Sequence, residues 1–151
     1  MSKFDLKGSG VETLPALSEG VRSWKLGPRH LLVTCDPAAR PSFPGTVLVT
    51  EVTSVLAQFL LAGPNARDIL AKLSSLNVSE GALPDGGCAQ TSLAHTHATV
   101  LRQDLGAIPA FHLLVARDYG EFAWDAILHA GHEFHAAPFG LEALGELGHG
   151  D

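Results

Sequence analysis

Two apolar stripes at helical spacing, set among short runs of strand-forming residues, constrain the fold of this chain most tightly. The first stripe recurs at i, i+3, i+4 and i+7 and consists of Ala66, Ile69, Leu70 and Leu73. A Gly63-Pro64 turn precedes it. Proline is tolerated at the first helical position because its missing N–H needs no partner there. The pattern therefore predicts a helix that opens at Pro64 and turns one face toward a core.

A second helix is predicted over residues 119–134, and Pro138 is expected to end it. Asp118, with Glu121 three residues later, has the spacing of a capping box at the start of this helix. The residues expected on its apolar face are Phe122, Ala123, Ala126, Ile127 and Ala130. Each helix thus needs a surface on which to bury one face.

Short runs with the composition or length of strands supply that surface. They cover residues 21–26, 31–33, 46–53, 55–61, 88–93, 97–102 and 111–116. Helices between groups of strands, with hairpin-like links, predict an α+β fold: a single domain with a mostly antiparallel sheet and helices packed on one face. We expect an irregular N-terminal arm over residues 1–20, the domain over 21–144 and a flexible tail over 145–151.

The charge content bears on the choice of partner. Charged residues make up 17% of the chain, against about 25% in an average protein. A surface short of charge indicates contact with another protein, although a monomer of low charge is the alternative. The net charge is −6 and the ten basic residues form no cluster. Nucleic acids and anionic membrane surfaces, which are bound through basic patches, are therefore not expected as partners.

The cellular compartment is predicted from the cysteines and the N-terminus. Cys35 and Cys88 lie in apolar stretches without CxxC spacing, which fits a reducing compartment. Residues 1–5 lack the apolar run of a signal peptide, and no apolar run approaches the roughly 20 residues that span a bilayer. We therefore expect a cytoplasmic protein.

Histidines are the candidates for metal ligands. His129, His132 and His135 recur at three-residue steps, and neighbouring pairs can share one side of a helix. His129 and His132 are accordingly the candidate ligands. The alternative, which we favour, is a solvated helix end whose histidines interact with the helix dipole and hold no metal. His95 and His97 are expected to face the same side of a strand, toward solvent or an interface.

Motifs for covalent or nucleotide chemistry do not occur in the sequence. It contains no GxSxG motif, and neither GxGxxG nor GxxxxGK[ST] follows a predicted strand. No histidine or helix N-terminus is placed to activate a cysteine. We therefore predict no catalytic residue in this chain.

Two segments resemble the folate-binding aminomethyltransferase superfamily, which includes the glycine-cleavage T-protein. Residues 61–70 resemble its helix opening with Gly-Pro-x-Ala-Arg, and residues 138–143 resemble its Pro-x-Gly-Leu-x-Ala segment. The motif residues are Gly63, Pro64, Ala66, Arg67, Gly140 and Leu141. Residues 24–28 and 87–91, with the overall length, are most similar to the γ subunit of heterotetrameric sarcosine oxidase. The resemblance covers roughly residues 21–144.

Departures from the superfamily pattern bear on function. T-proteins carry a Tyr-Thr-Gly-Glu segment that helps to hold folate, and residues 101–110 lack its tyrosine and glutamate. Arg102 is a candidate match to the arginine just upstream, and so the candidate cofactor-binding residue. The region with the T-protein's catalytic aspartate belongs to an earlier part of the domain, which this chain lacks. The resemblance thus implies that this chain alone binds no cofactor and carries out no catalysis.

In complexes of the sarcosine oxidase type, the resemblance implies a division of labour. The large subunit handles NAD and tetrahydrofolate, another subunit carries FAD, FMN lies between them, and a small subunit binds zinc. The γ subunit would be a non-catalytic structural partner of the α, β and δ subunits. The whole oxidoreductase would act on CH–NH groups and oxidatively demethylate sarcosine or a related N-methyl amine.

Two alternatives to the γ-subunit interpretation are kept, and whether this chain is itself an enzyme is left open. One is a stand-alone small folate-binding protein of one-carbon transfer. The other is a small domain that self-assembles and serves an unrelated binding role.

Overall fold

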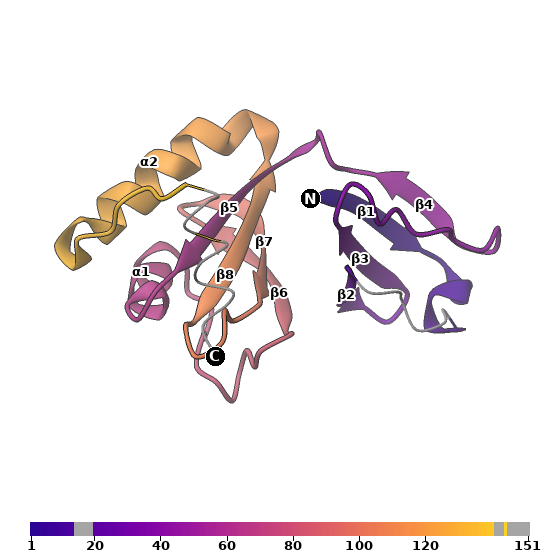
Figure 1. Ribbon diagram of the computed structural model, residues 1–151, viewed down its shortest axis with the longest axis horizontal. Coiled ribbons are helices and arrows are strands. Elements are labelled where there is room, and N and C mark those ends of the chain that lie inside the picture. Colours follow the sequence, from indigo (N-terminus) through magenta and orange to yellow (C-terminus); the bar gives the residue numbers. More distant parts are fainter. Residues whose placement is uncertain (14–19, 141–143, 145–151) are drawn as a thin grey trace. The chain divides into compact units, whose positions relative to one another are not determined.

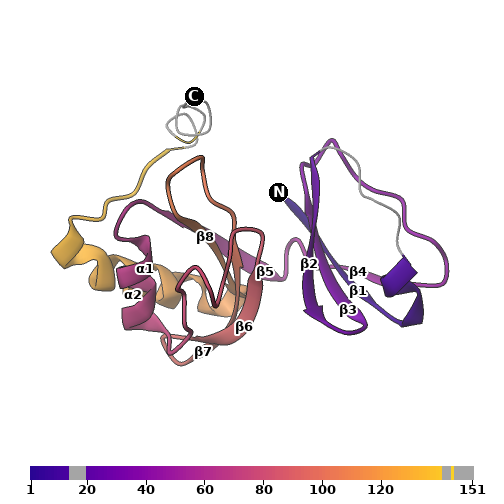
Figure 2. The same ribbon diagram turned by 90° about the horizontal axis from the view of Figure 1, so that it is seen from below.

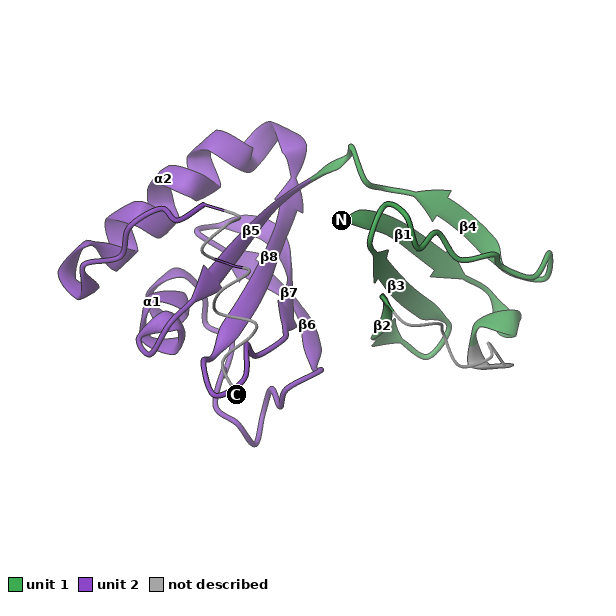
Figure 3. Ribbon diagram, in the orientation of Figure 1, with its two compact units in different colours: residues 1–56 green, residues 57–151 purple. Residues whose placement is uncertain are grey.

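The chain divides into two compact units, each with its own sheet. The computed structural model describes residues 1–13, 20–140 and 144. Residues 1–56 form unit 1 and residues 57–151 form unit 2 (Figure 3). The predicted boundary at residue 20 does not coincide with this division, and the predicted tail over 145–151 lies outside the described residues.

Unit 1 contains a four-stranded antiparallel sheet. Its strands are β1 (Ser2–Lys7), β2 (Val21–Gly27), β3 (His30–Cys35) and β4 (Leu48–Glu51), arranged in the order β2-β3-β1-β4 (Figure 1). A 3₁₀ turn, Ser9–Thr13, follows β1. The predicted strands over 21–26 and 31–33 are confirmed, whereas the run over 46–53 forms a shorter strand than expected.

The expectation of an irregular arm over residues 1–20 is wrong for Ser2–Lys7. This segment is an inner strand, paired with β3 on one side and β4 on the other. Phe4 and Leu6 alternate with Asp5 and bury their side chains in the core of unit 1. The alternation is present in the sequence, but the glycines that follow and the position at the chain end hide it. Pairing with two strands distant in sequence is what makes the segment regular.

Unit 2 contains the second sheet and both α-helices. Its elements are β5 (Leu56–Ala62), α1 (Ala66–Leu73), β6 (Cys88–Leu93), β7 (Thr96–Arg102), β8 (Ala110–Ala116) and α2 (Gly120–Gly131), with 3₁₀ turns at Arg117–Tyr119 and His132–Phe134. The strand order is β5-β8-β7-β6. The β6–β7 and β7–β8 pairs are antiparallel. The N–H of Gly63, just after β5, donates to the oxygen of Pro109, just before β8, so this pair also runs antiparallel.

The two α-helices lie on the same face of this second sheet (Figures 1 and 2). Residues from both helices and from the facing side of β7 and β8 form one core, which includes Ile69, Leu70, Val100, Phe111, Leu113, Ala123 and Ile127. The predicted α+β class, with antiparallel strands and helices on one face, is therefore confirmed. The structure differs from the expectation in having two sheets instead of one.

The helix boundaries show where local signals were misleading. Helix α1 begins at Ala66 after Asn65, so Pro64 precedes the helix and does not occupy its first position. Helix α2 begins after Tyr119 with no side-chain cap, because the chain first makes a 3₁₀ turn; the predicted capping box is wrong. Phe122, expected on the apolar face, is 52% exposed. The helix gives way to a 3₁₀ turn after Gly131, well before Pro138.

A two-residue turn, Ala94-His95, joins β6 to β7. The φ angles are 45° at Ala94 and 69° at His95, in the left-handed region that type I′ turns require. His95 thus lies in the turn and does not share a strand face with His97, contrary to the prediction. The N–H of Ala94 donates to the oxygen of Leu73 at the end of α1, 2.8 Å away. Contact with the helix holds the turn in a conformation that its residue types disfavour.

We expect His95→Gly to raise the free energy of unfolding by about 0.5–1 kcal/mol. Glycine has no Cβ to strain at positive φ, and this gain exceeds the entropy that glycine adds to the unfolded chain. Urea unfolding followed by circular dichroism measures the change, with His97→Gly as the control that weakens an ordinary strand position. A lower unfolding midpoint in His95→Gly would contradict the expectation.

The two α-helices are also short. Among the described residues, no helix is long and apolar enough to cross a membrane.

Candidate functional site

Arg102, the candidate cofactor-binding residue, ends strand β7 and is 2% exposed. Its guanidinium makes a two-pronged contact with Asp104: Nε donates to Oδ1 at 3.0 Å and Nη2 donates to Oδ2 at 2.5 Å. Paired donors on a planar guanidinium match the two oxygens of a carboxylate. Asp104 is itself held in place, since Oδ1 accepts from the N–H of Ala110 at 3.1 Å. The pair is therefore a rigid unit between β7 and the start of β8.

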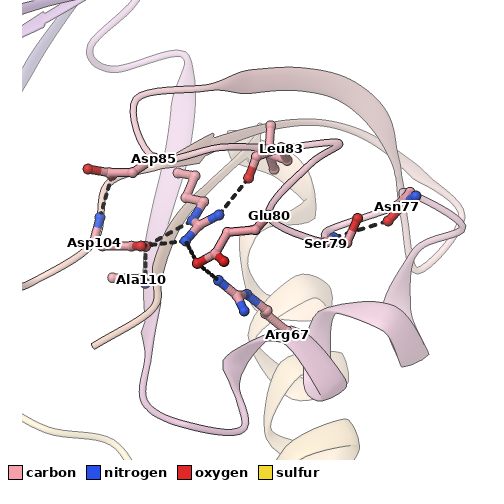
Figure 4. Close-up of polar contacts among 9 residues, drawn as sticks. Arg67, Asn77, Ser79, Glu80, Leu83, Asp85, Asp104 and Ala110 are labelled. Atoms are coloured by element: carbon pink, nitrogen blue, oxygen red, sulfur yellow. Dashed lines mark hydrogen bonds and ion pairs between the residues drawn. The ribbon is translucent and has the colours of Figure 1, made fainter. Parts of the chain in front are cut away.

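The remaining donors of Arg102 reach the connection between α1 and β6. Nη1 donates to the oxygen of Leu83 at 2.8 Å, and Nη2 also lies 3.4 Å from Oε1 of Glu80. Arg67, from the first turn of α1, donates to the same oxygen of Glu80 at 3.2 Å. Figure 4 shows Glu80 and Leu83 on this connection, with Arg67 approaching from the helix. On the other side, Asp85 accepts from the N–H of Asp104 at 2.9 Å.

The electrostatics follow from these contacts. Hydrogen bonds from Arg102 lower the pKa of Asp104, and the bond to Asp104 raises the pKa of Arg102 further. The pKa of Glu80 is lowered mainly by its hydrogen bond with Arg67 and also by that with Arg102. Glu80 is largely exposed, so its contacts are screened by water, whereas the Arg102–Asp104 pair is shielded.

The arrangement holds the α1–β6 connection against the sheet. Nε, Nη1 and Nη2 of Arg102 all donate to protein oxygens. The cluster contains two arginines and three carboxylates, so its charges are largely balanced internally. Among the described residues, Nε of Arg67 is a buried donor without a partner. These contacts give Arg102 a structural role, and cofactor binding at this residue stays a prediction.

The sequence pointed to Arg102 but not to the residues that surround it. Glu80 and Asp85 are more than ten residues away along the chain, and no local pattern links them to Arg102. Asp104 stands two residues after Arg102, between β7 and β8. The two-residue spacing between Arg102 and Asp104 is the one local feature that could have predicted their ion pair. A carboxylate shortly after an arginine at the end of a strand can turn back and bind the guanidinium.

The family motif residues at 63–67 form the turn from β5 into α1. Gly63 has a φ of +136° and accepts from the N–H of Ala66 at 3.1 Å. Ala66 is buried against the core, while Pro64 is exposed. The motif therefore sets the direction of α1 and brings Arg67 to Glu80. Of the second motif, Gly140 is exposed and Leu141 lies outside the described residues.

The candidate metal ligands lie at the end of α2. His129 is on the helix and His132 on the following 3₁₀ turn, and both are exposed. His135 follows with a φ of 54°. Within residues 1–13, 20–140 and 144, no three histidine, cysteine or carboxylate side chains are gathered as a metal site requires.

The two cysteines and Trp24 take structural positions. Burial raises the pKa of both Cys35 and Cys88, which keeps these thiols protonated and weakly nucleophilic at neutral pH. Trp24 is buried in unit 1, and its Nε1 donates to Oγ1 of Thr34 at 2.9 Å. Neither arrangement offers a reacting group.

An apolar groove of about 420 Å³ lies in unit 2 along β5 and α2. The side chains that line it include Phe59, Leu60, Trp124, Leu128 and Phe139. The rings of Phe59 and Trp124 lie 5.9 Å apart between centroids, tilted by 33°. Among the described residues that line the groove, none is charged. The described walls of the groove are therefore suited to contact with apolar groups.

Comparison with known proteins agrees with the resemblance at the level of the family. The GCVT N-terminal domain matches residues 31–148. The "Sarcosine oxidase subunit alpha" of Rhizobium meliloti is 34% identical over 103 residues, which cover 67% of this chain and 10% of the relative. The protein of the same name from Corynebacterium sp. strain U-96 is 33% identical over 100 residues, covering 65% of this chain and 10% of the relative. The chain thus spans about a tenth of the length of these curated relatives.

The fold is also found in a solved structure. A chain of the heterotetrameric sarcosine oxidase from Corynebacterium sp. U-96, determined in complex with pyrrole 2-carboxylate, aligns with a TM-score of 0.71 and 21% identity. The alignment covers 92% of this chain and 83% of the matched chain. Since the family match includes well over half of the residues, this chain belongs to the GCVT N-terminal domain family.

Proposed function

We propose that this chain is the small, non-catalytic γ-type subunit of a sarcosine-oxidase-like complex. The observation that carries the proposal is the size of the matched chain. Because 92% of 151 residues corresponds to 83% of that chain, it has about 170 residues. The α-subunit relatives are about 1,000 residues long, since 103 residues are a tenth of one. The matched chain is thus far shorter than the α-subunit relatives, which supports the role of a small subunit.

The geometry of the chain supports a structural role over a catalytic one. The buried arginine donates its hydrogen bonds to protein oxygens. The two thiols have raised pKa values. The groove carries no ionisable group among its described lining residues. Acid–base and nucleophilic catalysis require groups that can exchange protons or attack a substrate. In this proposal the α, β and δ subunits carry out catalysis. They also bind the cofactors, which are FAD, FMN, NAD, tetrahydrofolate and zinc.

The proposed complex oxidatively demethylates sarcosine or a related N-methyl amine. The names of the relatives and of the matched structure, all of which are sarcosine oxidases, support this substrate class. In this proposal the chain contributes by burying surface against its larger neighbours. The low charge content of 17% suits a subunit with much of its surface covered.

Co-expression with the α, β and δ subunits of the same organism tests the proposal. We expect the chain to co-purify with them at a fixed stoichiometry and the complex to oxidise an N-methyl amine. The chain alone should show no oxidation and no heat on titration with tetrahydrofolate. Elution of the chain apart from the other subunits would overturn the proposal. Heat from tetrahydrofolate binding to the chain alone would instead favour the stand-alone folate-binding alternative.

A further inference from the structure

We infer that residues 136–140 form a strap that keeps strand β5 and the apolar groove beside it from pairing with a second copy of the chain. The strap consists of Ala-Ala-Pro-Phe-Gly and follows the last turn of α2. The inference goes beyond the proposed function, because it concerns the chain by itself. Three observations carry it: the composition of the sheet edge, the turn at the end of α2 and the walls of the groove.

Strand β5 ends the order β5-β8-β7-β6, so among the described residues a strand lies beside only one of its edges. Its sequence, Leu-Ala-Gln-Phe-Leu-Leu-Ala, contains neither charge nor proline. Natural proteins protect such edges with charged residues, proline or a covering element. The edge strands of the first sheet carry charges, such as Arg22 on β2 and Glu51 on β4. Strand β5 has no charge of this kind and therefore depends on a covering element.

The end of α2 turns the chain into the strap. The N–H of Ala136 donates to the oxygen of Gly131, and the N–H of His135 donates to the oxygen of His132, each at 3.1 Å. His135 lies between these donors in the left-handed region, with a φ of 54°. These two bonds around a left-handed residue form a Schellman motif, which ends a helix. The chain beyond the motif turns back from the end of α2 (Figures 1 and 2).

The strap is one of the walls of the groove. All five of its residues line the groove, together with Leu60 of β5, Trp124 and Leu128 of α2, and Leu144. The described lining residues carry no charge, so the strap places apolar residues beside an apolar surface. Phe139 remains 44% exposed, which shows that the strap is not deeply packed. Its position therefore depends strongly on where it starts.

A close contact between Gly131 and Ala136 fixes that start. A Cβ added to Gly131 would lie 2.6 Å from the Cβ of Ala136, closer than two such atoms can pack. Gly131→Ala therefore has to displace the strap, although alanine suits the helix better than glycine does. Gly140, within the strap, offers a matched control. A Cβ added there meets no described atom within 4 Å, so Gly140→Ala leaves the strap in place.

Two measurements on the purified full-length chain test the inference. Sedimentation velocity measures self-association, and acrylamide quenching in dilute solution measures the exposure of Trp124; Trp24 is 2% exposed and contributes little. Gly131→Ala should self-associate at least about 10-fold more tightly than wild type, and its quenching constant should rise about twofold. Gly140→Ala should match wild type in both. The double variant Gly131→Ala with Ala136→Gly removes the clash and should restore wild-type behaviour.

Two truncated chains decide the question if Gly131→Ala does not fold. A chain that ends at His135 lacks the strap and should self-associate, whereas a chain that ends at Leu144 keeps it and should behave as wild type. Wild-type self-association and quenching in the chain that ends at His135 would overturn the inference. Equal self-association of both truncated chains, or of wild type and Gly131→Ala, would also overturn it. No measurement here uses a larger subunit, so the proposed function is tested separately.

Discussion

Arg102→Met is expected to lower the free energy of unfolding by about 3–5 kcal/mol, one of the two largest effects of a single substitution in this chain. Methionine keeps the length of the side chain but removes every donor. Asp104 then keeps its charge in a largely shielded position without its main partner. The oxygen of Leu83 also loses its donor, so the connection between α1 and β6 loosens. Urea unfolding of the purified chain measures the change.

Two further variants separate the buried pair from its exposed neighbour. Glu80→Gln should leave the unfolding midpoint close to that of wild type, because Glu80 is 76% exposed and its contacts with Arg67 and Arg102 are screened. The double variant Arg102→Met with Asp104→Asn should recover part of the lost free energy of unfolding, because it also removes the unpaired charge of Asp104. If Arg102→Met unfolds at the same urea concentration as wild type, the pair is not a stabilising contact.

The same pair predicts a loss of stability in acid. The pKa of Asp104 is lower in the folded chain than the value of about 4 that an unfolded chain shows. A lowered pKa contributes stability above the unfolded value, and this contribution is lost as the pH falls through the folded value. The contribution of Asp104 should therefore be intact at pH 5 and decline below about pH 4. The difference in stability between wild type and Asp104→Asn should shrink over that range.

Phe111→Ala should lower the free energy of unfolding by about 3–5 kcal/mol through loss of packing. Phe111 lies on β8, is fully buried and belongs to the core that both α-helices share. Truncation removes the ring and leaves a cavity that the strand and the helices cannot fill without moving. Thermal and urea unfolding of the variant provide the measurement.

Phe122→Ala is the matched control for this truncation. Phe122 is half exposed on the side of α2, so its removal should change the free energy of unfolding by no more than about 0.5 kcal/mol. A similar loss in both phenylalanine variants would mean that the core on the helical face of the sheet is not what stabilises unit 2.

Local patterns in the sequence determined most elements of unit 2. The spacing of Ala66, Ile69 and Leu70 predicted helix α1 and the face that it buries. The apolar runs around Val100 and Leu113 predicted strands β7 and β8. These predictions succeed because periodicity and side-chain shape act between residues a few positions apart. The family motif at residues 63–67 could also be recognised in the sequence. The residues that form a turn into a helix are consecutive along the chain, so the pattern is local.

The tertiary structure decided what depends on contacts between distant residues. Ser2–Lys7 is a strand because β3 and β4 pair with it. Arg102 contacts Glu80 and Leu83 because the α1–β6 connection folds back onto the end of β7. The groove exists because Phe59 and Trp124, more than sixty positions apart, meet at a sheet edge. The sequence by itself determined most elements of unit 2 and the family, whereas strand β1, the sheets, the buried ion pair and the groove arose from long-range packing. Such packing depends on which surfaces meet, and no local pattern encodes that.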